Sequence, residues 1–179
     1  MSDVKIVVDH LKLDYKGPFE FNALCRLINA FTKERGFDSR YDKDFEINTK
    51  TGKHIEWQIS PWKKITDYIR YMVKVRILID DMVKVEVIKD KKKVKVDNGR
   101  LIMFIDGFIE FDYFHKWDQH PFFMFLRSLY DRFIYKAYTE RFEQRLVYDI
   151  HHLHDRTEKF LNVYRHYRVV TKVPHYAYH

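Results

Sequence analysis

The sequence predicts an α+β fold: an antiparallel β-meander of about five to seven strands, one N-terminal helix, and a long C-terminal helix that is continuous or broken. The first observation is the strict alternation of apolar and other residues over residues 69–79. In a strand, this alternation places the following residues on one face: Ile69, Tyr71, Val73, Val75, Ile77 and Ile79. The second is residues 122–167, which lack glycine and proline and repeat apolar residues at spacings of three and four. The third is the short polar gaps between alternating runs, which favour hairpins because a parallel crossover needs about a dozen residues or more.

The N-terminal third supplies a strand, a helix and a hairpin. Residues 4–8 (VKIVV) predict a first strand that ends in a turn at DYKGP. Helical spacing of apolar residues from Pro18 to Phe37 predicts a helix that Asn22 caps and Gly36 ends. Residues 45–59 predict a hairpin around a glycine-containing turn, and Ser60-Pro61 then breaks the chain.

The centre of the chain reads as a meander of short strands. Their expected ranges are 69–79, 83–87, 94–96, 101–105 and 108–114. We expect turns between them at Asp80-Asp81, in KDKKK, in DNGR and at Asp106-Gly107, because these residue types favour turns.

The last third is helical. Pro121 suits a first helical turn, and an apolar stripe then continues through Leu146, Ile150, Leu153 and Thr157. The stripe shifts around Glu140 and Gln144, so we expect a bend or break there. No linker composition appears, so we predict one domain over residues 1–167 and a loose tail over 168–179.

The order strand, helix, antiparallel strands and long helix resembles the helix-grip architecture of START-type lipid- and hormone-binding domains. The resemblance covers most of the chain and rests on element order. A second helix, which that family usually has after the first, is not evident here. The resemblance implies an apolar ligand cavity between the sheet and the helix at residues 121–140, although a fold by itself does not determine function.

Composition restricts the class of protein. With 179 residues, 46% hydrophobic content and one cysteine, the chain can form a stable core without disulfides. Cys25 lies in the apolar run of a helix, which predicts an inert thiol. Neither a signal peptide nor an apolar run of membrane-spanning length is evident, so we expect a cytoplasmic protein. Phosphate-binding glycine loops and nucleophile motifs are also missing, so we expect no cofactor and lean against an enzyme.

The formal net charge is +7, which favours anionic partners. We expect the side of the meander opposite its apolar face to be basic, with a possible nucleic-acid contact through Arg70, Lys74, Arg76, Lys84, Lys93 and Lys95. This predicted face has no aromatic residues for base stacking, which argues against the nucleic-acid interpretation.

An aromatic stretch opens the long C-terminal helix. We expect its residues to form a hydrophobic interface or to line a cavity: Phe122, Phe125, Tyr135, Tyr138 and Phe142. Apolar residues on two sides of a helix imply cover on two sides. The cover would be the curled sheet, a second copy of the chain, a protein partner or a membrane surface.

A histidine-rich stretch, DIHHLHDRTE, follows on the same helix. His151, His154, Asp155 and Glu158 fall opposite the apolar stripe, at spacings that suit one divalent ion. An ordinary solvated helix face shows the same pattern, and we favour that interpretation. Glu110 and Asp112 share one side of a strand, where either acid–base chemistry or pairing with neighbouring cations is open, and we favour pairing.

The sequence therefore favours a non-enzymatic binding or assembly protein. Its partner would be another protein chain or a second copy of itself, or an anionic partner such as nucleic acid or a nucleoprotein. One alternative is a helix-grip binder of a hydrophobic small molecule or lipid. The other is a metal-dependent or acid–base enzyme that uses the His151–Glu158 helix face.

Overall fold

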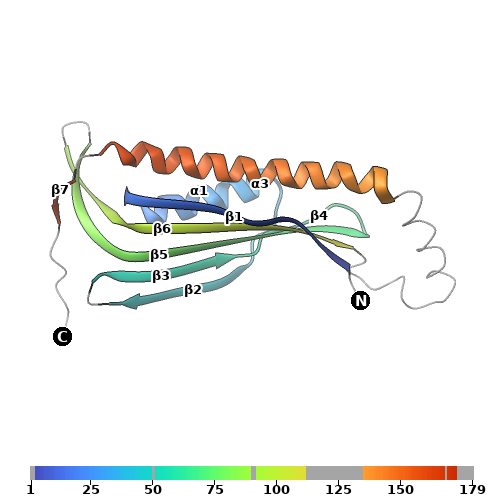
Figure 1. Cartoon of the computed structure of the whole chain (residues 1–179), viewed down its shortest axis with the longest axis horizontal. Coiled ribbons are helices and arrows are strands. Elements are labelled where there is room, and N and C mark those ends of the chain that lie inside the picture. Colours follow the sequence, from blue (N-terminus) through green and yellow to red (C-terminus); the bar gives the residue numbers. More distant parts are fainter. Residues whose placement is uncertain (1–2, 50, 90–91, 112–134, 168, 173–179) are drawn as a thin grey trace.

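The computed structural model describes residues 3–49, 51–89, 92–111, 135–167 and 169–172, and its α+β fold is the one that the sequence predicts (Figure 1). Seven strands and two helices are described, in the order β1 (Asp3–Phe19), α1 (Phe21–Glu34), β2 (Tyr41–Asn48), β3 (Lys53–Ile59), β4 (Trp62–Lys64), β5 (Ile69–Lys89), β6 (Lys92–Phe111), α3 (Tyr135–Arg165) and β7 (Val169–Lys172). The sheet order is β1-β6-β5-β3-β2, with β4 and β7 also paired to β5, and all of these pairings are antiparallel.

The centre of the sheet is one long hairpin, where the sequence predicted several short ones. β5 has 21 residues and β6 has 20, so the chain does not turn at Asp80-Asp81, in DNGR or at Asp106-Gly107. A β-bulge between Asp80 and Val83, with Asp81 at φ 51°, absorbs the first polar pair. Polar residues at the other positions continue the ladder: Arg100 and Asp106 point away from the helices, while Asp97 on the helix side accepts the Phe21 N–H and pairs with Lys84.

The first strand is also longer than predicted. β1 pairs with β6 from Asp3 to Phe19, so the predicted turn at DYKGP is instead part of the ladder. Register shifts between Ile6 and Val8 and between Val8 and Leu11 bend the strand in its first half. The local preference of these residues for a turn is overridden by backbone pairing with β6.

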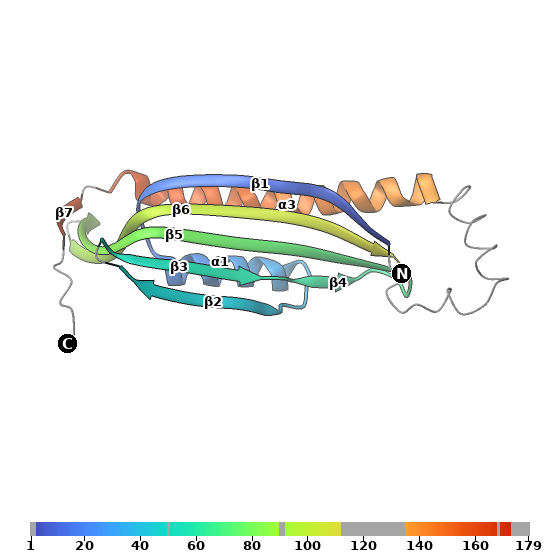
Figure 2. The same cartoon turned by 60° about the horizontal axis from the view of Figure 1, so that its bottom comes forward.

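Both helices lie on one face of the sheet, and the opposite face is turned to the viewer in Figure 2. The core lies between the helices and the sheet. It is built from alternate residues of β5 and β6, such as Val75 and Ile105, together with Ile28 of α1 and Ile150 of α3. The predicted apolar stripe of the C-terminal helix is confirmed, since Leu146, Ile150, Leu153 and Thr157 are all buried.

Helix α1 ends as predicted but begins differently. Gly36, at φ 71°, follows its last turn and donates its N–H to the Lys33 carbonyl at 2.9 Å. Asn22 lies inside the helix and does not cap it. The carboxylate of Asp97 on β6 accepts the backbone N–H of Phe21 at 3.2 Å, so a residue distant in the sequence satisfies a free N–H group at the start of the helix.

Helix α3 runs without interruption past Glu140 and Gln144, so the predicted break there is wrong. The shift of the apolar stripe is accommodated by a single straight helix that lies along β1 and β6 (Figure 1). The part of the prediction that concerns residues 121–134 falls outside the described residues. The predicted loose tail is wrong at its start, because β7 pairs with β5.

Little space is left between the helices and the sheet in the part of the chain that the structure describes. The apolar pocket there, lined by Phe31, Phe37, Val73, Ile150 and neighbours, has a volume of about 10 Å³. A site for a small-molecule ligand usually has about 300–1,000 Å³. The predicted ligand cavity lies against the helix at residues 121–140, of which 121–134 are outside the described residues, so it stays a prediction.

Candidate functional site

The face of the sheet that points away from both helices, which we call the outer face, carries apolar residues on β1, β2, β4, β5 and β6, while the outward residues of β3 (His54, Glu56 and Gln58) are polar. The apolar residues are Val4, Ile6, Phe45, Ile47, Trp62, Met72, Leu78, Ile102, Phe104 and Phe108. Ile6 is 56% exposed and Ile47 is 44% exposed. A sheet face that meets only water is usually polar, so this composition is informative. No described residue covers it (Figure 2).

The predicted basic face is divided in the structure. Arg70, Lys74 and Arg76 do lie on the outer face, each opposite an outward residue of β6. The bulge at Asp81 reverses the alternation of β5 beyond it, and so Lys84 turns to the helix side. There its ammonium group lies 2.5 Å from the Asp97 carboxylate. The same carboxylate accepts the backbone N–H of Phe21 at the N-terminus of α1.

Most of the cationic side chains on the outer face form ion pairs with carboxylates or lie over aromatic rings. Arg70 Nε donates to Glu110 Oε2 at 2.9 Å, and the Arg70 guanidinium also lies over Trp62, with 5.7 Å to the ring centroid. Arg76 lies over Phe104 at 5.3 Å. Arg100 pairs with Asp14 at 2.8 Å and Lys43 with Glu56 at 2.5 Å. The face is a mosaic of apolar groups and ion pairs, and the prediction that it lacks aromatic residues is wrong.

Two of the predicted basic residues lie near the closed end of the β5–β6 hairpin. Lys93 and Lys95 are exposed there, beside the exposed apolar side chains of Ile88 and Val94. This end is remote from Arg70 along the hairpin (Figure 1), so the six predicted residues do not form one patch.

The aromatic helix is only partly within the described residues. Phe122 and Phe125 lie outside them, as do the side chains of Tyr135 and Tyr138. Phe142 is half-buried and packs against the core, and its carbonyl accepts the Tyr71 hydroxyl at 2.8 Å. For this residue the described contacts are those of a core position.

The histidine stretch is divided as well. Ligand atoms of His154, Asp155 and Glu158 lie within 4.8 Å of one another on the solvent side of α3. His151 lines a different surface pocket of about 560 Å³, with Val7 and Tyr148. The three clustered side chains all come from α3, and the His154 side chain is 19% exposed while Asp155 and Glu158 are exposed.

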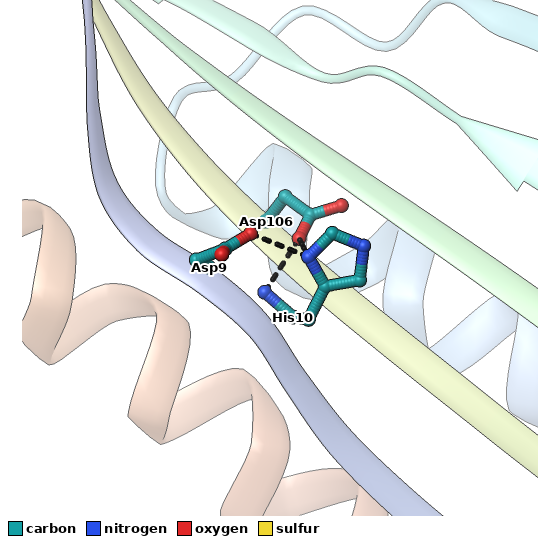
Figure 3. Close-up of side chains that lie close together, drawn as sticks. All are labelled: Asp9, His10 and Asp106. Atoms are coloured by element: carbon teal, nitrogen blue, oxygen red, sulfur yellow. Dashed lines mark hydrogen bonds and ion pairs between the residues drawn. The ribbon is translucent and has the colours of Figure 1, made fainter.

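A second cluster, which the sequence analysis missed, joins two strands at the outer face (Figure 3). Asp9 and His10 are on the irregular part of β1, and Asp106 is on β6. The backbone N–H of His10 donates to Asp106 Oδ1 at 2.7 Å. Nδ1 of the His10 ring lies 3.4 Å from the same oxygen and contacts the Asp9 carboxylate. The sequence predicts a first strand that ends at residue 8 and a turn at Asp106-Gly107, so there was no reason to expect these three residues to meet.

The remaining candidates for catalysis are the Cys25 thiol and the carboxylates of Glu110 and Asp112. Cys25 is partly buried, and burial raises the pKa of its thiol to about 12, which disfavours the reactive thiolate at neutral pH. Glu110 is buried against Arg70, as predicted for a carboxylate beside an adjacent strand, and Asp112 lies outside the described residues.

Comparisons with protein-family models, curated proteins and solved structures found no match to this chain. The resemblance to START-type domains therefore remains one of element order. None of the helices among the described residues is both long and apolar enough to span a membrane.

Proposed function

We propose that this protein is a binding and assembly protein whose outer face docks a second copy of the same chain. The observation that carries the proposal is the row of outward apolar side chains on adjacent strands. Leu78 and Ile102 are cross-strand neighbours at its centre, and Phe104 and Phe108 extend the row along β6. Aromatic residues and arginine beside apolar groups are typical of protein–protein interfaces.

The charges of the outer face favour a copy of the chain over nucleic acid. Basic residues of the face alternate with Asp14, Glu56, Asp80, Asp106 and Glu110. Because most of these cations are paired with carboxylates or lie over aromatic rings, this face of mixed charge can meet its own two-fold image without strong repulsion, despite the formal +7 of the whole chain. Phosphate contacts would instead require cations that are not already engaged by carboxylates or aromatic rings.

The size of the outer face is adequate for a stable dimer. Five strands spaced about 4.8 Å apart, each contributing roughly ten residues at about 3.3 Å, present on the order of 800 Å². A standard interface buries about 800 Å² on each partner. Two sheets can pack face to face in this way, as they do in a β-sandwich.

The test is the mass of the untagged full chain in solution, measured by sedimentation equilibrium and native mass spectrometry. We expect a dimer for the wild type and a monomer for Ile102→Glu, because the new carboxylate would be buried at the centre of the interface. Val163→Glu on α3 is the matched control, since Val163 is also an exposed apolar residue and should not affect the dimer.

A wild-type monomer at about 100 µM would overturn the proposal, as would a dimer that Ile102→Glu leaves intact. Co-purification of nucleic acid that is lost in Arg70→Glu and Lys74→Glu variants would show instead that the outer face binds phosphates.

A further inference from the structure

We propose that Asp9, His10 and Asp106 bind a divalent first-row transition-metal ion such as Zn²⁺. The site lies on the outer face, but all three ligands come from one chain, so the proposal does not require the dimer. One ligand atom from each of the three side chains lies within 4.8 Å of the other two. An imidazole nitrogen with two carboxylate oxygens is a donor set that suits such ions, while oxygen-only sites suit Mg²⁺ and Ca²⁺.

The backbone of β1 is shaped to present two of the ligands. Register shifts on both sides of Val8 interrupt the ladder, and His10 adopts φ 49°, a left-handed conformation that is uncommon outside glycine. Bulges of this kind re-aim side chains near functional sites. Here the result is that two neighbouring residues, Asp9 and His10, both reach Asp106 on the next strand (Figure 3).

Asp106 differs from the other buried carboxylates of the described residues. Asp97 pairs with Lys84, Glu110 with Arg70 and Asp149 with Arg35. Asp106 is only 5% exposed, yet its ion pair among the described residues is with His10 alone. A buried carboxylate normally requires a positive partner.

The charges of the cluster suit a divalent ion. Asp9 and Asp106 together bring two negative charges, and Lys74, the cross-strand neighbour of Asp106, makes no ion pair with it among the described residues. A divalent ion offsets both and takes Nδ1 of a neutral His10 as its third ligand. The exposed side chains of Asp9 and His10 leave room for water to complete the coordination.

The test is calorimetric titration of Zn²⁺ into untagged full-length protein after chelator treatment. We expect one site whose affinity falls at least about tenfold in His10→Asn and in Asp9→Asn. Asparagine is the conservative choice at position 10, because it tolerates the left-handed conformation. Circular dichroism should show that both variants are folded.

The exposed cluster on α3 provides the matched controls. His154→Asn and Asp155→Asn remove ligands there and should leave the tight site unchanged. Long-range ¹H–¹⁵N NMR of the histidine rings should show Zn²⁺ on Nδ1 of His10.

Three results would overturn the proposal. Loss of binding in His154→Asn with retention in His10→Asn would place the site on α3. Equal, weak binding by all variants would mean adventitious surface binding by the ten histidines of the chain. Ring resonances of His10 that do not respond to Zn²⁺ would exclude it as a ligand.

Discussion

At the scale of single residues, Arg35 joins the two helices. Its guanidinium lies 3.2 Å from the buried Asp149 carboxylate and donates to His152 Nδ1 at 2.6 Å, and it lies over the rings of Phe31 and Tyr148. Because arginine is only a donor, Nδ1 of His152 must be unprotonated in this arrangement. The histidine of DIHHLHDRTE that lies nearest the core thus has a structural role.

We expect Arg35→Met to lower the free energy of unfolding by about 2 kcal/mol, because it leaves Asp149 buried without a cation. The half-buried position of Arg35 keeps this below the loss for a fully buried pair. Urea unfolding measures the difference, and Arg35→Met with Asp149→Asn should recover part of it.

Arg156→Met is the comparison at the same helix pair, since Arg156 binds the exposed Glu34 and should matter less. If Arg35→Met is no more destabilising than Arg156→Met, Asp149 does not depend on Arg35.

At the scale of elements, periodicity predicted the faces of residues 69–79 and of the C-terminal helix correctly, while the bulge at Asp81 reversed the predicted face of Lys84 and the ends of the strands were misplaced. Alternation in residues 69–79 and the stripe from Leu146 to Thr157 are set by burial, which local sequence records directly. The ends of β1, β5 and β6 depend on partners that are distant in the chain. Asp106-Gly107 has the composition of a turn, yet β1 and β5 hold it in the sheet from both sides.

Gly107 shows why that position lacks a side chain. A Cβ there would lie 2.2 Å from Ile150 Cδ1, at the point where α3 crosses β6. We expect Gly107→Ala to lower the free energy of unfolding by about 1–3 kcal/mol through overpacking. The double variant Gly107→Ala/Ile150→Val removes the clashing methyl group and should lose less than the sum of the single variants. Denaturant unfolding of all four proteins gives the coupling, and strict additivity would exclude the contact as the cause.

At the scale of the whole molecule, the sequence located the candidate surfaces only in part. It identified the outward cations of β5, because they alternate with the core residues of the same strand. It could not show that β6 places Glu110, Asp106 and Phe104 directly opposite them. That pairing changes a predicted basic face into one of mixed charge, and it also creates the cluster of Asp9, His10 and Asp106. Both results depend on the register between strands, which composition does not contain.

Ion pairs between elements should also give the fold a characteristic response to acid. Asp14 and Glu34 have pKa values lowered by hydrogen bonds from Arg100 and Arg156, and the pKa of Glu56 is lowered by Lys43. These pairs join β1 to β6, α1 to α3 and β2 to β3.

Because the folded-state pKa of each carboxyl lies below its unfolded-state value, the stabilisation is complete above the unfolded pKa and is lost as the pH falls through the folded pKa. We therefore expect the free energy of unfolding to decrease below about pH 4.5. The triple variant Asp14→Asn/Glu34→Gln/Glu56→Gln should show a shallower decrease, and about 1 M salt should weaken the effect in the wild type. Urea unfolding between pH 2.5 and 7 provides the measurement. Identical pH profiles for the triple variant and the wild type would mean that other carboxyl groups control acid unfolding.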